Sequence, residues 1–137
     1  MNETQVKNEL RSKLKDRGAS VVRFEDRFRS GLPDCLVGKM GRCAFVEVKL
    51  SGTGKNSLYE PWTWPAYKMG QCLLIQELSK FSGVRAFYLV YDPEFKRSLI
   101  ALVSIVVEAS RKRIPINAGF VDKGYQDENL LLLIERK

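Results

Sequence analysis

The sequence contains no histidine. This absence excludes serine–histidine–aspartate and cysteine–histidine catalysis, zinc sites built from histidine, and any hydrolase that depends on a histidine base. If the protein is an enzyme, its chemistry must come from carboxylates, lysine, cysteine or a bound metal ion.

Cysteines are few, and long apolar runs are missing. Cys35, Cys43 and Cys72 are odd in number and match no zinc signature, so we interpret them as buried free thiols of an intracellular protein. The longest apolar stretch, residues 98–107, is too short to cross a bilayer, and no N-terminal region resembles a signal peptide. We therefore expect a cytoplasmic protein that contacts no membrane.

Acidic residues are outnumbered by basic ones. The chain has 23 lysines and arginines against 16 aspartates and glutamates, a net charge of +7. This balance favours an anionic partner, and nucleic acid before a membrane because the basic residues are interspersed along the chain. A surface charge that only maintains solubility is the alternative.

Periodicity and turn residues divide the chain into helices and strands. Val6, Leu10 and Leu14 recur every four residues, as in an amphipathic helix that ends at Gly18. The predicted order is a helix over 3–17, a strand over 19–26, a hairpin of strands 34–38 and 43–50, a helix over about 66–81 that ends at Gly83, and strands over 84–92 and 97–105. On the helix over 66–81, the expected buried residues are Met69, Leu73, Leu74, Ile75 and Leu78.

The tail contains a possible short helix over 107–113 and a strand or helix over 129–137. The 137 residues fit one domain. The order of elements predicts an α/β fold with an αβββαβ core over about 3–106, in which helices flank a mixed central sheet. Residues 107–137 form a C-terminal extension.

Two carboxylates and a lysine stand in the predicted hairpin, which is otherwise suited to burial. Strand alternation places Glu47 and Lys49 on one face and the apolar residues of the strand on the other. If the hairpin closes with Gly38 opposite Cys43, Asp34 falls directly opposite Glu47.

Carboxylates that face each other repel, so in an empty site the pKa of one of them should be raised. A divalent cation between Asp34 and Glu47 removes the conflict, and oxygen ligands suit Mg²⁺ or Mn²⁺. Lys49 would lie beside the metal, where it can orient water or stabilise charge on phosphorus. The alternative is a cross-strand ion pair on a solvated face.

These residues resemble the signature of the PD-(D/E)xK nuclease superfamily, most closely its VRR-NUC and archaeal-type Holliday junction resolvase branch. "PD" at 33–34 is followed by twelve residues and then "EVK" at 47–49, with a helix that ends at a glycine upstream and a helix that carries Gln71 downstream. The resemblance covers about residues 3–92 and implies a restriction-endonuclease-like fold.

The resemblance implies a role for each matched residue. Asp34 and Glu47 would be metal ligands, the backbone carbonyl of Val48 a further ligand, and Lys49 the catalytic lysine. An acidic residue of the first helix often completes such a site. Glu3 fits the spacing best and Glu9 is the alternative, although either is equally a solvated helix residue.

Gln71 would help position the site or the DNA backbone. Gln76 on the same helix is the alternative for this role, and Gln71 is equally an ordinary polar residue of the helix. The segment 51–67 departs from the branch by its aromatics and prolines. Its Trp62, Trp64 and Tyr67 either stack on exposed bases or pack inside the protein. Seven basic residues are candidates for contacts with phosphates: Arg23, Arg27, Arg29, Lys39, Arg42, Lys55 and Lys68.

The resemblance thus implies a Mg²⁺- or Mn²⁺-dependent DNA endonuclease without a small-molecule cofactor, selective for Holliday junctions or other branched DNA in repair or recombination. A homodimer is expected, because two sites on a two-fold axis match a four-way junction. The alternatives are a catalytically inactive nucleic-acid-binding subunit and a restriction-type or RNA-directed nuclease. A small stand-alone copy looks phage-like, so a bacterial or phage-infected cytoplasm is expected.

Overall fold

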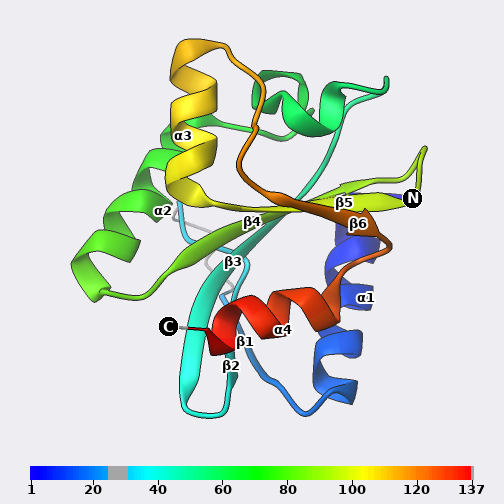
Figure 1. The fold of residues 1–137 in the computed structure, drawn as a ribbon. Helices are drawn as coiled ribbons and strands as arrows, with labels where there is room; N and C mark the ends of the chain where they lie inside the picture. Colours follow the sequence, from blue (N-terminus) through cyan, green and yellow to red (C-terminus); the bar gives the residue numbers. More distant parts are fainter. Residues whose placement is uncertain (25–30, 137) are drawn as a thin grey trace.

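A six-stranded mixed sheet forms the centre of the molecule, seen in a computed structural model that describes residues 1–24 and 31–136 (Figure 1). The strands lie side by side in chain order, and β3 and β4 are the parallel pair while all other neighbours are antiparallel. The strands are β1 (Ser20–Arg23), β2 (Cys35–Lys39), β3 (Arg42–Leu50), β4 (Ala86–Asp92), β5 (Arg97–Leu102) and β6 (Phe120–Lys123).

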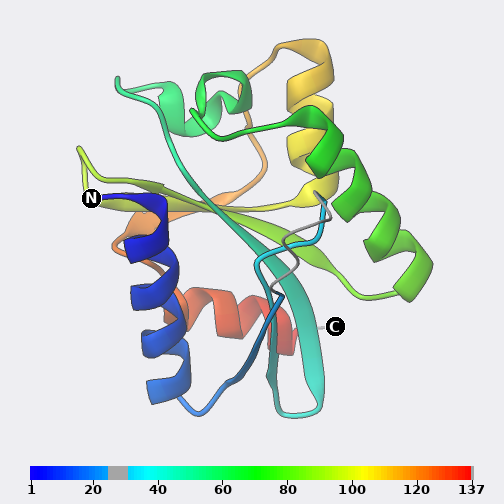
Figure 2. The ribbon, with the colours of Figure 1, turned by 180° about the vertical axis from the view of Figure 1, so that it is seen from behind.

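In the part of the chain that the structure describes, four α-helices cover the two faces of this sheet (Figures 1 and 2). The first face packs against α1 (Glu3–Asp16) and α4 (Asp127–Glu135), and the second against α2 (Met69–Ser82) and α3 (Val103–Lys112). Together with the sheet order, this arrangement confirms the predicted α/β fold with a mixed sheet flanked by helices.

The alternation along β3 decides which residues enter which core. Val46 and Val48 join the core under α1 and α4, whereas Phe45 joins the core under α2 and α3. Glu47 and Lys49 have the same parity as Phe45, so they belong to the second face. One acidic and one basic side chain are thereby buried in β3.

The helix α1 forms as its sequence indicates. The side chain of Asn2 accepts a hydrogen bond from the backbone N–H of Gln5, whose side chain accepts one from the N–H of Asn2. Its apolar stripe, Val6, Leu10 and Leu14, is fully buried against the sheet. This helix brings the N-terminal residues next to the beginning of β2.

Three expectations about burial and boundaries on the second face are wrong. Leu74 is 52% exposed, because α2 turns Cys72 and Ile75 to the sheet instead. Cys43 is exposed near the hairpin turn, whereas Cys35 and Cys72 are buried free thiols as predicted. The helix begins at Met69 rather than near residue 66, since two short 3₁₀ helices, η1 (Ser57–Tyr59) and η2 (Pro61–Thr63), occupy the preceding segment.

The chain after β4 also departs from the expected elements. The predicted strand over 97–105 ends at Leu102, and α3 starts at Val103. The boundary was missed because the apolar run contains no glycine or proline, and periodicity alone does not distinguish a buried strand from a buried helix. The tail adds the edge strand β6 and ends in the helix α4, whose Leu130 and Ile134 are fully buried. The C-terminal extension therefore completes the first core.

No helix within 1–24 or 31–136 is long and apolar enough to cross a membrane.

Candidate active site

The hairpin of β2 and β3 has the predicted register. Gly38 pairs with Cys43, and the ladder continues to the pair of Cys35 and Val46. The ladder ends at this pair, and Asp34 is the residue directly before β2. The strand pairing confirms the predicted hairpin register, and the position of Asp34 opposite Glu47 stays a prediction that follows from it.

The carboxylate of Asp34 ties the start of β2 to the middle of β3. Its Oδ2 accepts a 2.7 Å hydrogen bond from the backbone N–H of Val48, while its Oδ1 lies 2.7 Å from the ammonium of Lys7 on α1. The side chain is 15% exposed. Pro33, the residue before Asp34, has no backbone N–H and cannot donate to a neighbouring strand. The hydrogen bond from Val48 to the Asp34 side chain extends the contact between the two strands beyond the ladder.

Glu47 is the most deeply desolvated acid of the site, with a residue exposure of 2%. Its Oε2 lies 3.2 Å from Nζ of Lys49, and its Oε1 is buried without a hydrogen-bond partner among the described residues. Burial first, and then the charge of Asp34, raise the pKa of Glu47 to about 8, although Lys49 acts in the opposite direction. A buried carboxylate oxygen with no partner is costly, so this atom marks a place for a cation or a donor.

Lys49 is buried beside Glu47 and does not lie on a solvated face. Its ammonium is 3.2 Å from Glu47 Oε2 and donates a 3.1 Å hydrogen bond to the carbonyl oxygen of Ala66. The alternative of a solvent-exposed ion pair is therefore wrong. The segment between β3 and α2 covers the lysine, and its backbone orients the charged group.

The first helix contributes a residue that the sequence analysis missed. Lys7 lies between Asp34 and Glu3, with Nζ 3.2 Å from Glu3 Oε1. Burial lowers the pKa of Lys7, but the hydrogen bond and charge of Asp34, together with Glu3, outweigh it and leave the pKa raised. Glu9 points elsewhere and accepts a hydrogen bond from the hydroxyl of Tyr125. Of the two acids considered for the site, the structure brings Glu3 toward Asp34.

The aromatic residues of the segment 51–67 differ in burial. Trp64 is 3% exposed, donates a 2.9 Å hydrogen bond from Nε1 to the Ser57 carbonyl, and packs edge-to-face on Tyr67. Tyr67 is half-buried, and its hydroxyl shares a 2.6 Å hydrogen bond with Ser110. Trp62 is partly exposed under the guanidinium of Arg113. Packing is therefore the role of Trp64.

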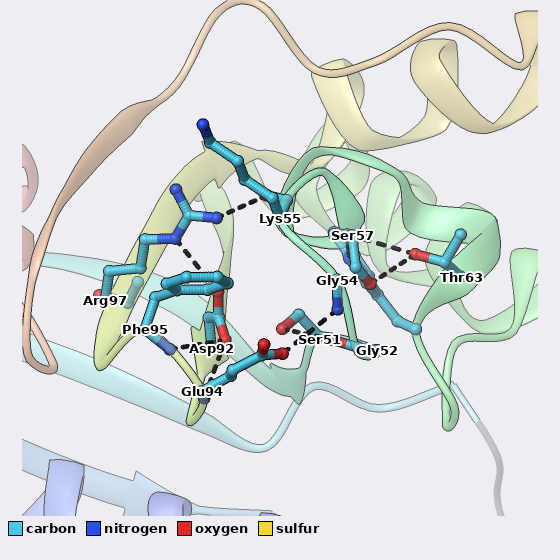
Figure 3. A network of polar contacts seen from close by, with 12 residues as sticks. Ser51, Gly52, Gly54, Lys55, Ser57, Thr63, Asp92, Glu94, Phe95 and Arg97 are labelled. Carbon is cyan, nitrogen blue, oxygen red and sulfur yellow. Dashed lines mark hydrogen bonds and ion pairs between the residues drawn. The ribbon is translucent and has the colours of Figure 1, made fainter.

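A polar network fixes the loop that follows β3 (Figure 3). The carboxylate of Asp92, at the end of β4, accepts hydrogen bonds from the backbone N–H of Glu94 at 3.0 Å and from Nε of Arg97 at 3.1 Å. Arg97 also donates to the Lys55 carbonyl at 2.6 Å, and Gly54 N–H donates to the Glu94 carboxylate at 3.3 Å. The turn between β4 and β5 thereby holds the loop from two sides.

The two glutamines considered for the site lie on different parts of α2. Gln71 is half-buried in the first turn of the helix. Gln76 lines a pocket of about 570 Å³ between α2 and α3, together with Glu77 and Lys80. Gln71, and not Gln76, therefore lies in the first turn of α2, next to the segment whose Ala66 carbonyl accepts from Lys49.

The predicted phosphate-binding residues fall into three places. Arg23 lines a pocket of about 220 Å³ together with Asp34, Lys7 and Arg11. Lys39 and Arg42 pair at the hairpin turn, and Arg42 lies about 16 Å from Glu47 along the extended strand. Lys55 and Lys68 are exposed on the segment between β3 and α2. Arg27 and Arg29 lie outside the described residues.

Comparison with known proteins identifies the fold. No protein-family model matches the sequence, and no curated protein sequence matches it. Among solved structures, the chain resembles Archaeoglobus fulgidus Hjc, a Holliday junction resolvase from an archaeal hyperthermophile, with a TM-score of 0.52 and 18% sequence identity. The match covers 74% of this chain and 78% of that chain. The protein therefore has an Hjc-like restriction-endonuclease fold, which is the fold of a nuclease family.

Proposed function

We propose that this protein is a divalent-metal-dependent DNA endonuclease that hydrolyses phosphodiester bonds, with a preference for branched DNA. One observation carries the proposal: on a nuclease fold, the carboxylate of Asp34 lies close enough to raise the pKa of Glu47, whose buried Oε1 lacks a partner among the described residues, beside a buried Lys49. The ion pair with Lys49 engages only Oε2, and a bound cation would give the buried Oε1 a partner.

The donor set fits Mg²⁺ or Mn²⁺, which prefer oxygen ligands. Asp34, Glu47 and the backbone carbonyl of Val48 would hold the ion, with Glu3 nearby on α1. No group of three or more acidic or cysteine side chains suited to a metal occurs among the described residues, so water and a substrate phosphate would complete the shell. When bound, the cation would neutralise the carboxylate pair and lower the pKa of a coordinated water.

In this proposal, Lys49 would stabilise the negative charge of the substrate. An ammonium group has three N–H donors. One is directed at the carbonyl of Ala66 and another at Glu47 Oε2, which fixes the orientation of the group and leaves the third for a phosphate oxygen. Such preorganised donors are effective because the desolvated site does not have to reorganise during the reaction.

A basic pocket next to Asp34 supports an anionic substrate. Lys7, Arg11 and Arg23 line it together with Asp34. Three cations around a small opening attract phosphate groups without reading base sequence, which agrees with a nuclease that recognises the shape of DNA. Selectivity for four-way junctions would further require a homodimer with two active sites.

The proposal is tested by cleavage assays on four-way junctions, flaps and linear duplexes of equal length, with Mg²⁺ or Mn²⁺. We expect the wild type to cut and the variants Asp34→Ala and Lys49→Ala to bind DNA without cutting it. Glu77→Ala and Lys80→Ala serve as controls. They remove one negative and one positive charge, respectively, at exposed positions of α2.

Binding without cleavage by the wild type would show a nucleic-acid-binding subunit instead of an enzyme. Equal cutting of linear and branched DNA would contradict the proposed preference for branched DNA but not the proposed hydrolysis. Cleavage of RNA in place of DNA would show that the substrate is RNA. Light scattering of the protein alone and with a junction measures whether the active species is a dimer.

A further inference from the structure

Lys7 connects the helix α1 to the carboxylate that the proposed metal requires. Its Nζ lies 2.7 Å from Oδ1 of Asp34 and 3.2 Å from Oε1 of Glu3, and the side chain is 24% exposed. A half-buried ammonium between two carboxylates is held by both, unlike a solvated surface lysine. The contact is specific to the folded protein, because Lys7 and Asp34 are far apart in the sequence.

Both oxygens of Asp34 are engaged, but in different ways. Oδ2 is bound to the backbone N–H of Val48, inside a strand that cannot move without breaking the sheet. Oδ1 is bound to Lys7, a long and flexible side chain. A divalent cation that approaches Asp34 therefore meets Lys7 at the one oxygen whose partner can move.

The two cations cannot share this oxygen without repulsion. A divalent ion and an ammonium group a few ångströms apart repel each other strongly where solvent screens them poorly. Lys7 lines the pocket of about 220 Å³ formed with Thr4, Arg11, Arg23, Phe24 and Asp34, so space for a displaced side chain lies directly beside its present position.

We propose that Lys7 is an internal cation of the active site, which occupies Asp34 until a divalent metal displaces it, and which thereby lowers the metal affinity of the site. This inference rests on the proposed function, since it concerns the same Asp34. Lys7 is a positioning residue here, not a catalytic one. Once displaced, its charge enters the basic pocket, where a substrate phosphate would hold it.

The first experiment measures metal binding without DNA or turnover. Mn²⁺ is titrated into the metal-free wild type, Lys7→Met and Lys15→Met by isothermal titration calorimetry. Methionine keeps the length of the aliphatic chain but removes the charge. Lys15 is an exposed lysine of the same helix and is the matched control. We expect Lys7→Met to bind Mn²⁺ about tenfold more tightly than the wild type, and Lys15→Met to be unchanged.

A second experiment uses the wild type alone and does not depend on how a variant folds. Nitrogen-15 NMR of the lysine ammonium groups follows the Lys7 signal during a titration with Mg²⁺. The displacement predicts that the chemical shift of Lys7 changes and that its protons exchange faster with water when the site is saturated, because the ion pair with Asp34 is lost.

The outcomes separate this inference from the proposed function. If the wild type binds Mn²⁺ but Lys7→Met binds it equally or more weakly, or if the Lys7 signal stays unchanged at saturation, Lys7 does not compete and only this inference fails. If neither the wild type nor Lys7→Met binds the metal, the proposed metal site fails and this inference fails with it. Tighter binding by Lys7→Met supports both.

Discussion

The carboxylate of Asp34 accepts a 2.7 Å hydrogen bond from the backbone N–H of Val48, the residue between Glu47 and Lys49. The two segments "PD" at 33–34 and "EVK" at 47–49 are therefore joined directly by a hydrogen bond. This contact fixes the Asp34 side chain at the point of β3 where Glu47 is desolvated. The contact is made between atoms of the chain itself, within the sheet, which restricts the orientation of the Asp34 carboxylate.

Asp34→Asn isolates the charge of this residue from its shape. The amide oxygen can still accept from Val48, but the pairing with Lys7 and the repulsion of Glu47 are lost. We expect DNA cleavage to fall by about 100-fold or more, since one carboxylate of the proposed metal site is removed. Single-turnover rates at saturating Mg²⁺ measure the effect. Cleavage at the wild-type rate would show that Asp34 has no part in the reaction.

Glu47 should make the stability of the metal-free protein depend on pH. Its pKa is raised, mainly by burial and next by Asp34, from 4.5 to about 8. Between these values the folded protein holds a proton that the unfolded chain has released, so the free energy of unfolding falls as the pH rises. Glu47→Gln cannot titrate and should show a smaller decrease between about pH 5 and about pH 8, by about 1–3 kcal/mol.

Urea unfolding in the presence of EDTA at several pH values measures this difference. Mn²⁺ at saturating concentration should remove most of the decrease in the wild type, because the cation stabilises the ionised form of Glu47. Identical slopes for the wild type and Glu47→Gln would contradict the raised pKa.

Lys49→Met should destabilise the protein through Glu47. The substitution leaves a buried carboxylate without its cation, at a cost of about 2–4 kcal/mol near pH 8 and less near pH 5, where Glu47 is protonated. The double variant Lys49→Met/Glu47→Gln should recover part of the loss, since it buries no unpaired charge. A double-mutant cycle from denaturant unfolding tests this, and strictly additive effects would contradict the pairing.

Trp64→Phe should lower stability without changing DNA affinity. The indole is buried and donates to the carbonyl of Ser57, so phenylalanine loses that hydrogen bond and some contact area, at about 1–3 kcal/mol. Trp62→Phe, at a partly exposed position, is the matched control and should cost less. Thermal unfolding and fluorescence anisotropy with single-stranded DNA measure the two quantities. A large loss of affinity in Trp64→Phe at unchanged stability would favour stacking on bases.

Asp92→Ala should loosen the loop after β3. Asp92 is 1% exposed and accepts from two backbone N–H groups and Arg97, so its removal leaves partly buried donors unpaired at a cost of about 1–3 kcal/mol. Hydrogen exchange should become faster at Gly54, whose N–H is held by Glu94 on the same turn. Unchanged exchange at Gly54 would show that the loop is held by other contacts.

Local pattern was sufficient for most of the core. The stripe of Val6, Leu10 and Leu14 predicted α1, and the alternation around Glu47 predicted both the hairpin register and the shared face with Lys49. These features depend on helix and strand periods and on a short turn, which a sequence contains in full. The same reasoning predicted that Asp34 lies opposite Glu47.

Tertiary structure decided what lies around that hairpin. Lys7 reaches Asp34 because α1 packs against the sheet, and Lys49 is buried because the segment before α2 folds over it and offers the Ala66 carbonyl. The exposure of Leu74 and the closure of the first core by α4 depend on how distant elements pack. Periodicity shows which face of an element is apolar, but the partner of a charged side chain is determined by contacts between elements far apart in the chain.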